Sequence, residues 1–243
     1  MRIAPEYMYR NHNYSRRPSG GGRRYRQPNH DLSRFIKKAD DSALATPYLP
    51  RTSFSSLEIV EALKRNVAGR GYSQPTPIQD QAIEPILQGR DLIGLANTGT
   101  GKTAAFLIPI IDKIFKDRSN RALIIVPTRE LAMQINEELK MLARDLKIYS
   151  TVVIGGASSA RQTFDIRRNP QVVIGTVGRL KDLVQRKILL LNDFSIFVLD
   201  EVDLMVDIGF INDVKYFVAL LPQERQSLFF SATISPKIRE ILQ

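Results

Sequence analysis

The sequence of 243 residues has no cysteine, no tryptophan and only two histidines. The lack of cysteine excludes disulfide bonds, thiolate metal sites and a cysteine nucleophile, and it fits a reducing compartment. His12 and His30 are too few and too poorly placed for a histidine metal site. No stretch approaches the roughly 18 uncharged apolar residues of a membrane-spanning helix. Residues 1–30 also lack the apolar region of a secretory signal.

Positive charge is present in excess and is unevenly distributed. The net charge is +10, from 35 Lys and Arg against 25 Asp and Glu. Residues 1–50 hold ten basic and four acidic side chains, so they carry +6, and the rest of the chain carries +4. Glycines and Pro18 interrupt any helix near residues 14–26, and no apolar period is visible there. These features predict a disordered basic arm over residues 1–48 and a folded domain over residues 49–243.

The arm has three possible roles at this stage. Five of the eight tyrosines lie in residues 1–50, where arginines can neutralise phosphates and tyrosines can stack on bases, which favours a nucleic-acid tether. The alternatives are a solvated tail that keeps the protein soluble and an organelle transit peptide. The Gly-rich centre would make a poor amphipathic helix, which argues against the transit peptide.

The folded part alternates short apolar runs with helical patterns. This alternation predicts an α/β fold, with a parallel sheet covered by helices on both faces. The expected strands are Asp91–Leu95, Ala122–Val126, Tyr149–Ile154, Gln171–Thr176, Ser195–Leu199 and Ser227–Phe230, and the expected helices lie near 102–117, 129–145, 158–168, 178–186 and 211–221. Ligands of such sheets bind beyond the carboxyl ends of the strands, so functional motifs should follow predicted strands.

A glycine-rich loop follows the first predicted strand and precedes a helix. Its residues are Ala96, Asn97, Thr98, Gly99, Thr100, Gly101, Lys102 and Thr103. Gly99 and Gly101 allow the backbone amides to turn inward and form an anion-binding nest. Lys102 can then reach the β- and γ-phosphates, and the Thr103 hydroxyl can bind Mg²⁺. The loop predicts a nucleoside triphosphate site, the alternative being a chance Gly/Thr turn.

A carboxylate pair, Asp200 and Glu201, ends the predicted strand Ser195–Leu199. A carboxylate at this sheet edge can hold the hydration shell of Mg²⁺, and its neighbour can orient a water for attack on the γ-phosphorus. We therefore expect Thr103 and Asp200 to share the metal, partly through water. The alternative is an acidic helix start stabilised by the helix dipole, which suits Asp203 best.

These motifs resemble those of the DEAD-box ATP-dependent RNA helicases, and the resemblance extends over residues 54–243. The sequence Asp200-Glu201-Val202-Asp203 matches the acidic box of the family with Val202 in place of alanine. The glycine-rich loop matches the family pattern A-x-T-G-x-G-K-T. The resemblance implies a RecA-like domain that uses ATP and Mg²⁺, with Lys102, Asp200 and Glu201 as catalytic residues.

The Q motif of the family is similar to a segment at about residues 52–80. Gln79 ends the run that begins at Gly71, and Phe54 lies 17 residues before that glycine. The resemblance implies that the Gln79 amide reads the adenine edge and that Phe54 stacks on the base, which selects ATP over GTP. From the residues alone, Phe54 could equally pack in the core and Gln79 could be a polar helix-surface residue.

Three further segments resemble the RNA-binding motifs of the family. Each follows a predicted strand, and together they supply Pro127, Thr128, Arg129, Gly155, Gly156, Thr176, Gly178 and Arg179. Amides, hydroxyls and guanidiniums of this kind bind the RNA backbone without reading its sequence. The alternatives are helix caps for the threonines and solvated charges for the arginines. The family usually has proline where this chain has Val177, which predicts a looser contact by Thr176 and Arg179.

Ser231 and Thr233 belong to a triplet that the family uses to link the nucleotide state to RNA strand separation through the acidic box. From the residues alone, the pair could instead cap a following helix. The family also has a second RecA-like domain, in cis, which carries arginines for the γ-phosphate, and no segment here matches it. We therefore expect a cytoplasmic N-terminal half of an RNA helicase that binds ATP and RNA weakly and hydrolyses little ATP alone, without any membrane association. A non-catalytic RNA-binding or scaffold module and a DNA-directed P-loop ATPase are the alternatives.

Overall fold

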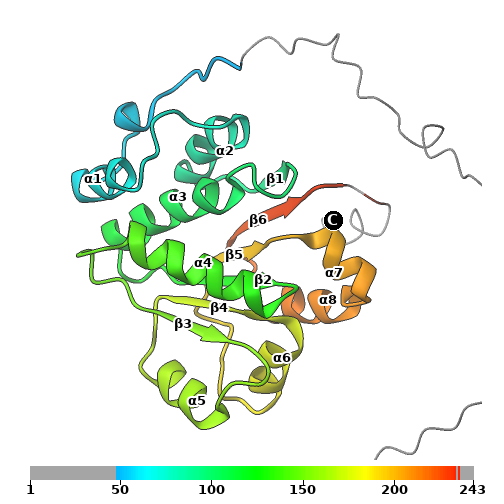
Figure 1. The fold of residues 1–243 in the computed structure, drawn as a ribbon. Coiled ribbons are helices and arrows are strands. Elements are labelled where there is room, and N and C mark those ends of the chain that lie inside the picture. Colours follow the sequence, from blue (N-terminus) through cyan, green and yellow to red (C-terminus); the bar gives the residue numbers. More distant parts are fainter. Residues whose placement is uncertain (1–47, 234, 236–243) are drawn as a thin grey trace, which may run out of the picture. The chain divides into compact units, whose positions relative to one another are not determined.

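The fold is built on one parallel sheet. The structure is a computed structural model that describes residues 48–233 and 235. Its sheet has the strand order β1-β6-β5-β2-β4-β3 (Figure 1). The strands are β1 (Leu92–Leu95), β2 (Ala122–Val126), β3 (Ser150–Val153), β4 (Val172–Thr176), β5 (Ile196–Leu199) and β6 (Gln226–Ser231). All six expected strands are present, β2 with the expected bounds and the others with slightly different ends. The predicted arm, except its last residue, lies outside the described residues.

Helices connect the strands, as the expected crossovers of a parallel sheet require. They are the short 3₁₀ helix η2 (Phe54–Ser56), α1 (Glu61–Gly69), α2 (Pro77–Leu87), α3 (Lys102–Lys116), α4 (Arg129–Leu142), α5 (Ser159–Arg167), α6 (Val177–Gln185), α7 (Val202–Ile208) and α8 (Ile211–Leu220). Helices α1, α2 and α7 were not expected from the sequence. None of the described helices has the length and apolar character needed to cross a membrane.

Strand β2 lies in the middle of the sheet and shows why the fold has two cores. All five of its residues are fully buried. Ala122, Ile124 and Val126 belong to one apolar cluster, and Leu123 and Ile125 belong to the other. Successive side chains of a strand point to opposite faces, so a strand that is apolar at every position must be covered on both sides.

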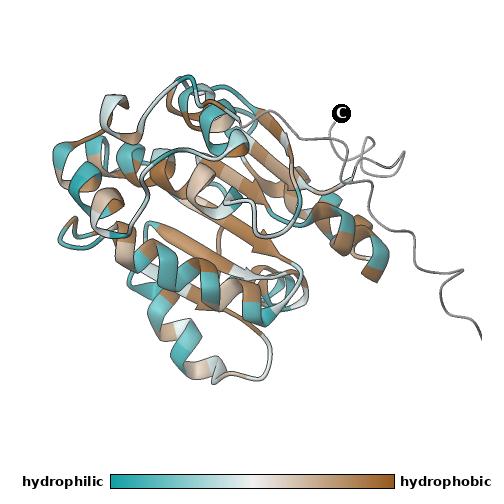
Figure 2. Cartoon of the chain, turned by 45° about the horizontal axis from the view of Figure 1, so that its top comes forward, coloured by the Kyte–Doolittle hydropathy of each residue, from teal (hydrophilic) through white to brown (hydrophobic). Residues whose placement is uncertain are grey.

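The helices form the two outer layers of the molecule. Helices α1 to α4 contribute to the cluster that contains Phe106 of α3, and α6, α7 and α8 contribute to the cluster that contains Phe217 of α8. Figure 2 shows the apolar strands between helices whose outward surfaces are largely hydrophilic. This arrangement is the α/β fold with helices on both faces that the sequence predicts.

The parallel register brings the carboxyl ends of the strands to one edge of the sheet. Leu95 pairs with Ser231, Leu199 with Ile125, and Val126 with Thr176. The loops that follow these strands therefore emerge side by side, which is where ligands of open parallel sheets bind.

Candidate functional site

The glycine-rich loop lies between β1 and α3. Its backbone adopts the left-handed conformation at Gly99, with φ of 82°, and at Gly101, with φ of 90°. The Thr100 hydroxyl donates to the Asn97 carbonyl at 2.7 Å and closes the turn. Gly101 precedes the first residue of α3, so the free amides of the helix N-terminus border the loop. The loop therefore has the curled backbone and helix start of an anion-binding site.

Lys102 is held inside this loop. Its side chain is largely buried, and its ammonium donates to the Ala96 carbonyl at 2.9 Å. A buried ammonium needs polar partners because desolvation of an isolated charge is costly. The single hydrogen bond to Ala96 leaves donor capacity on Nζ that the phosphate oxygens of a nucleotide can use.

Asp200 lies directly after β5 and is 2 % exposed. Burial raises the pKa of its carboxyl to about 6, against the opposing attraction of Lys102, while the charge of Glu201 adds to the rise. The Glu201 amide donates to Asp200 Oδ1 at 3.0 Å, and Glu201 itself has a left-handed backbone with φ of 57°. This bent backbone turns the chain from β5 into α7 and directs the two adjacent carboxylates differently.

One cavity of about 330 Å³ is lined by both the loop and the acidic pair. The residues that line it are Tyr72, Thr98, Gly99, Gly101, Lys102, Thr103, Ala104, Leu131, Gln134, Glu138, Asp200 and Glu201. The two segments lie about 100 positions apart in the sequence, and the sheet brings them together. Lysine, hydroxyl and carboxylate groups thus face one space, as phosphate and magnesium binding both require.

Gln79 joins helix α2 to the glycine-rich loop. Its amide oxygen accepts from the Thr76 amide at 2.9 Å, and its amide nitrogen donates to the Gly101 carbonyl at 3.1 Å. A side chain at Gly101 would collide with this amide nitrogen, so the contact requires glycine there. Phe54 is 5 % exposed and packs against Tyr72 with the ring centroids 5.6 Å apart. The adenine contacts expected of Gln79 and Phe54 stay predictions.

Three polar residues of the cavity were not singled out from the sequence: Tyr72, Gln134 and Glu138. The Tyr72 hydroxyl donates to Glu138 Oε1 at 2.8 Å, and the Arg70 guanidinium binds Glu138 Oε2 at 3.1 Å. Burial, together with the hydrogen bond to Glu138, raises the pKa of Tyr72 above its usual value. The spacing of four between Gln134 and Glu138 on α4 is the one local signal that places them on a common helix face.

A second cavity, of about 670 Å³, gathers the three segments expected to bind RNA. It is lined by Pro127, Thr128, Arg129, Glu130, Gly155, Thr176, Val177, Gly178, Arg179 and Phe210. Of the residues expected here, Gly156 alone is outside the lining. The loops after β2, β3 and β4 therefore meet at one place, beside the cavity of the glycine-rich loop along the same sheet edge.

The glycine pair after β3 makes room for Arg129. A Cβ atom at Gly156 would collide with the Arg129 guanidinium, and one at Gly155 would approach its Nη2 to 3.1 Å. Gly156 also has φ of 80°, which side chains other than glycine rarely adopt. The pair thus allows an exposed arginine to lie against the backbone at the cavity.

Arg179 is fixed by side chains of its own helix, α6, and of the neighbouring helix α5. Its guanidinium contacts Asp182, and it donates to Gln162 Oε1 at 3.1 Å and to Ser159 Oγ at 2.7 Å. Val177, at the position where the family usually has proline, is the first residue of α6. Its side chain is fully buried and packs in the core. The side chain of Thr176 makes no cap hydrogen bond for this helix.

Thr128 does cap its helix, since its hydroxyl accepts from the Leu131 amide at 3.2 Å. The capping alternative for Thr128 is therefore realised at the start of α4.

Ser231 and Thr233 are connected to the acidic box by hydrogen bonds. The Asp203 amide donates to Ser231 Oγ at 3.2 Å. The Asp203 carboxylate accepts from the Ala232 amide at 3.0 Å and from the Thr233 amide at 3.1 Å. The end of β6 is thereby tied to the first turn of α7. A smaller cavity of about 220 Å³ next to this link is lined by Lys102, Glu201 and Asp203 among others.

The described residues hold no group of three or more His, Cys, Asp or Glu side chains that could enclose a metal ion. Magnesium does not need such a cage, because it keeps several waters and binds through one or two protein groups and the phosphates. Thr103 and Asp200, both in the lining of the first cavity, are oxygen ligands of the required kind.

Comparison with known proteins identifies the family. The family model described as DEAD/DEAH box helicase matches residues 76–241. The chain is 44 % identical over 189 residues to "ATP-dependent RNA helicase CshA" of Limosilactobacillus reuteri, covering 77 % of this chain and 38 % of that protein. It is 42 % identical over 202 residues to "DEAD-box ATP-dependent RNA helicase RhpA" of Helicobacter pylori strain B128, covering 83 % and 40 %.

Solved structures agree with this match. A DEAD box protein from Methanococcus jannaschii aligns with a TM-score of 0.73 at 34 % identity, over 78 % of this chain and 52 % of that one. A hypothetical ATP-dependent RNA helicase from Sulfolobus tokodaii aligns with a TM-score of 0.70 at 34 % identity, over 75 % and 53 %. The chain thus spans about two fifths of these curated relatives and half of these solved chains. It belongs to the DEAD/DEAH box helicase family.

Proposed function

We propose that the chain is the ATP-binding half of an ATP-dependent RNA helicase. The observation that carries the proposal is the common sheet edge: one cavity is lined by Lys102, Thr103, Asp200 and Glu201, and the next gathers the loops after β2, β3 and β4. ATP hydrolysis and RNA binding are thereby served by loops of the same rigid sheet. The printed names of the relatives support this combination.

In the proposed mechanism, each residue of the first cavity has one task. Bound Mg²⁺ neutralises charge on the terminal phosphates, and Thr103 and Asp200 would hold it, partly through water. Lys102 binds the β- and γ-phosphates together with the loop amides. Glu201 orients the attacking water and accepts its proton. Ser231 and Thr233, which bond to Asp203, carry the nucleotide state towards the RNA side.

In the second cavity, we propose that Arg129 and Arg179 bind RNA phosphates, assisted by the hydroxyls of Thr128 and Thr176. Pro127, Gly155, Gly156 and Gly178 shape the backbone around these groups. Such contacts recognise the shape of the strand rather than its sequence. The basic residues 1–50, with net charge +6, would add phosphate contacts to the binding of RNA. We place the protein in the cytoplasm.

Replacement of Lys102 tests the nucleotide site. We expect Lys102→Ala to raise the Kd for Mg-ATP by about tenfold to a hundredfold, since a hydrogen bond to a charged group is worth about 1.5–3 kcal/mol. Isothermal titration calorimetry measures this Kd directly. Lys64→Ala is the matched control, because Lys64 is on α1 and pairs with the exposed Glu61. An unchanged affinity in Lys102→Ala would refute the phosphate-loop assignment.

Replacement of Arg129 tests the RNA site separately. Loss of one phosphate contact should weaken binding of unrelated single-stranded RNA sequences to a similar extent. It should also reduce the slope of log K against log salt by about 0.7. Fluorescence anisotropy at several salt concentrations gives both quantities. Arg65→Ala, an exposed arginine on α1, should leave the slope unchanged. An unaltered slope in Arg129→Ala would remove this residue from the RNA surface.

A further inference from the structure

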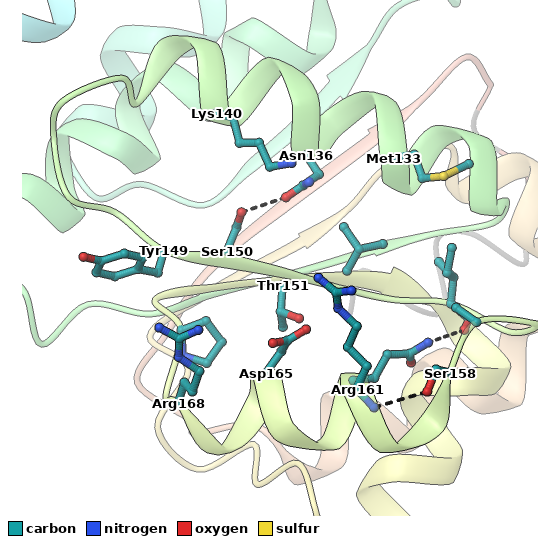
Figure 3. Close-up of a pocket in the computed structure, with 15 residues that line it drawn as sticks. Met133, Asn136, Lys140, Tyr149, Ser150, Thr151, Ser158, Arg161, Asp165 and Arg168 are labelled. Carbon is teal, nitrogen blue, oxygen red and sulfur yellow. Dashed lines mark hydrogen bonds between the residues drawn. The ribbon is translucent and has the colours of Figure 1, made fainter.

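A groove of about 660 Å³ runs along β3 between α4 and α5 (Figure 3). It shares no lining residue with the two cavities assigned to nucleotide and RNA. Met133, Asn136 and Lys140 of α4 form one wall, and residues of α5 form the other. The floor is β3 itself, together with Tyr149 and Ile154 at its two ends. The proposed function uses none of these side chains.

Strand β3 is the end of the sheet order and so has one unpaired edge. The Val172 amide of β4 donates to the Tyr149 carbonyl at 3.1 Å. Because the backbone groups of alternate residues point to opposite sides of a strand, those of Tyr149 and Thr151 point towards β4, and those of Ser150 and Val152 point into the groove. In the described part of the chain, no loop, turn or other segment forms a backbone hydrogen bond with these groups of Ser150 and Val152. The groove therefore offers the backbone donors and acceptors of Ser150 and Val152, whereas the next carbonyl on this side, that of Ile154, already accepts from Gln162 Nε2 at 2.9 Å.

Apolar and basic side chains predominate around this open edge, and Asp165 of α5 is the one acidic residue in the lining. Met133 is 47 % exposed and Tyr149 is 63 % exposed at the groove, although both are large apolar or aromatic residues. Lys140, Arg161 and Arg168 are also exposed along the groove. Lys140 pairs with Glu137, whereas Arg161 has no ion pair among the described residues.

Charge and hydrogen-bonding chemistry select among the possible occupants. Residues 1–47 of this chain carry ten basic and four acidic side chains, so they have the wrong sign. A second copy paired strand to strand by a two-fold axis would bring the same basic walls together. An RNA backbone supplies acceptors for the arginines, but it has no alternating donors and acceptors to match a strand edge. An extended peptide has both, and acidic side chains complement the net positive charge of the walls, where Lys140, Arg161 and Arg168 outnumber Asp165.

We propose that this groove binds an extended acidic segment of a partner protein, which adds to β3 as a further strand. The Ser150 hydroxyl donates to Asn136 of α4 at 2.7 Å, so side chains at this level point alternately towards α4 and α5. The added strand would follow the same alternation. Apolar side chains would then face Met133, and carboxylates would face Arg161 and Arg168.

A binding measurement with a defined probe tests the charge requirement. The probe is a fluorescent, end-capped peptide with the sequence (Val-Glu)₄, and (Val-Lys)₄ is its opposite-charge control. We expect saturable binding of the first peptide alone. The double variant Arg161→Glu with Arg168→Glu should raise the Kd about tenfold or more. Arg65→Glu, an exposed reversal on α1, should leave it unchanged. Equal affinity in the double variant, or equal binding of (Val-Lys)₄, would overturn the proposal.

Hydrogen exchange on the unaltered chain tests strand addition itself. Bound peptide should slow exchange of the Ser150 and Val152 amides at least about tenfold and leave Thr151, which already faces β4, unchanged. A (Val-Glu)₄ peptide with alternate amides N-methylated should give no protection when the methylated side faces β3. Absence of protection at saturating peptide would overturn the proposal even if the charge-reversal variant fails to fold. Octauridylate that displaces the peptide and loses affinity in the double variant would assign the groove to RNA instead.

Discussion

At the scale of single residues, Asp200 is an acidic group whose pKa the fold raises into the range near neutral pH. Its carboxyl is almost fully buried, and burial raises its pKa from 3.8 to about 6 despite the nearby Lys102 ammonium. The folded state therefore holds this proton more tightly than the unfolded state does. The contribution of Asp200 to stability therefore falls as the pH rises from about 4 to about 6, and it is not recovered above that range. In the proposed mechanism, this carboxylate weakens the free protein but would supply negative charge to a bound Mg²⁺.

Asp200→Asn should remove this penalty. In the absence of nucleotide and with EDTA present, the variant should be more stable than the original chain at pH 7.5, by up to about 3 kcal/mol from two pKa units. The gain should disappear at pH 4, where the original carboxyl is protonated. Urea unfolding at both pH values measures the two free energies. Asp207→Asn, at an exposed position of α7, should show the same difference at both. A pH-independent gain in Asp200→Asn would contradict the assigned burial effect.

At the scale of elements, the link between α7 and the end of β6 is a short set of hydrogen bonds to one carboxylate. Asp203 accepts from the amides of Ala232 and Thr233 and from the Thr233 hydroxyl at 3.4 Å. Helix α7 directly follows Asp200 and Glu201, which line the cavity. Strand β6 pairs with β1, the strand that leads into the glycine-rich loop. Movement of α7 with the state of the nucleotide would therefore be passed to the segment after β6.

Asp203→Ala should release the segment after β6 while leaving the strand itself in place. The amides of Ala232 and Thr233 lose their acceptor, so their hydrogen exchange should accelerate by about tenfold, corresponding to about 1.4 kcal/mol. The amide of Leu228, inside the sheet, should exchange as before. Mass spectrometry or NMR resolves these positions, with Asp207→Ala as the control on the same helix. Equal acceleration along all of β6 would show instead that the variant destabilises the sheet.

The sequence predicts those elements whose signals are local. All six strands were found because each contains a short apolar run, and in β2 that run is the whole strand, with every residue buried. Helix α2 was missed because it contains Pro85, which normally opposes a helix interior. Helix α7 has only seven residues, too short for a clear apolar period. Helix α1 has no side-chain cap to mark its start.

The candidate site also has parts that the sequence predicts and parts that it does not. The phosphate loop and acidic pair are contiguous motifs that follow strands, so they could be placed before the fold was known. The contacts of Glu138 with Tyr72 and Arg70 join positions 66 and 68 residues apart, and no local pattern indicates them. The same is true of the groove along β3. It depends on β3 being an edge strand, and the order of strands in a sheet cannot be read from one segment.

At the scale of the whole molecule, the nucleotide cavity lacks one kind of group. Among the residues that line it, Lys102 is the single cation and no arginine is present. In phosphoryl transfer, an arginine that stabilises the transition state contributes about 10³–10⁵ in rate. The resemblance to the helicase family implies that such arginines come from a second RecA-like domain. We therefore expect the described cavity to hold a nucleotide better than to hydrolyse it.

Because no arginine lines the described cavity, we expect the 243-residue chain to bind Mg-ATP but to hydrolyse it very slowly, even with saturating RNA. A coupled phosphate-release assay should give a rate within about threefold of Glu201→Gln, the variant without the proposed base, because the dominant electrostatic contribution of an arginine is missing from both. Calorimetric binding of Mg-ATP to the same samples shows that the chain is folded and loaded. DNA in place of RNA should leave the rate equally low. A robust RNA-stimulated rate that Glu201→Gln abolishes would mean that this domain completes the catalytic site with its own residues.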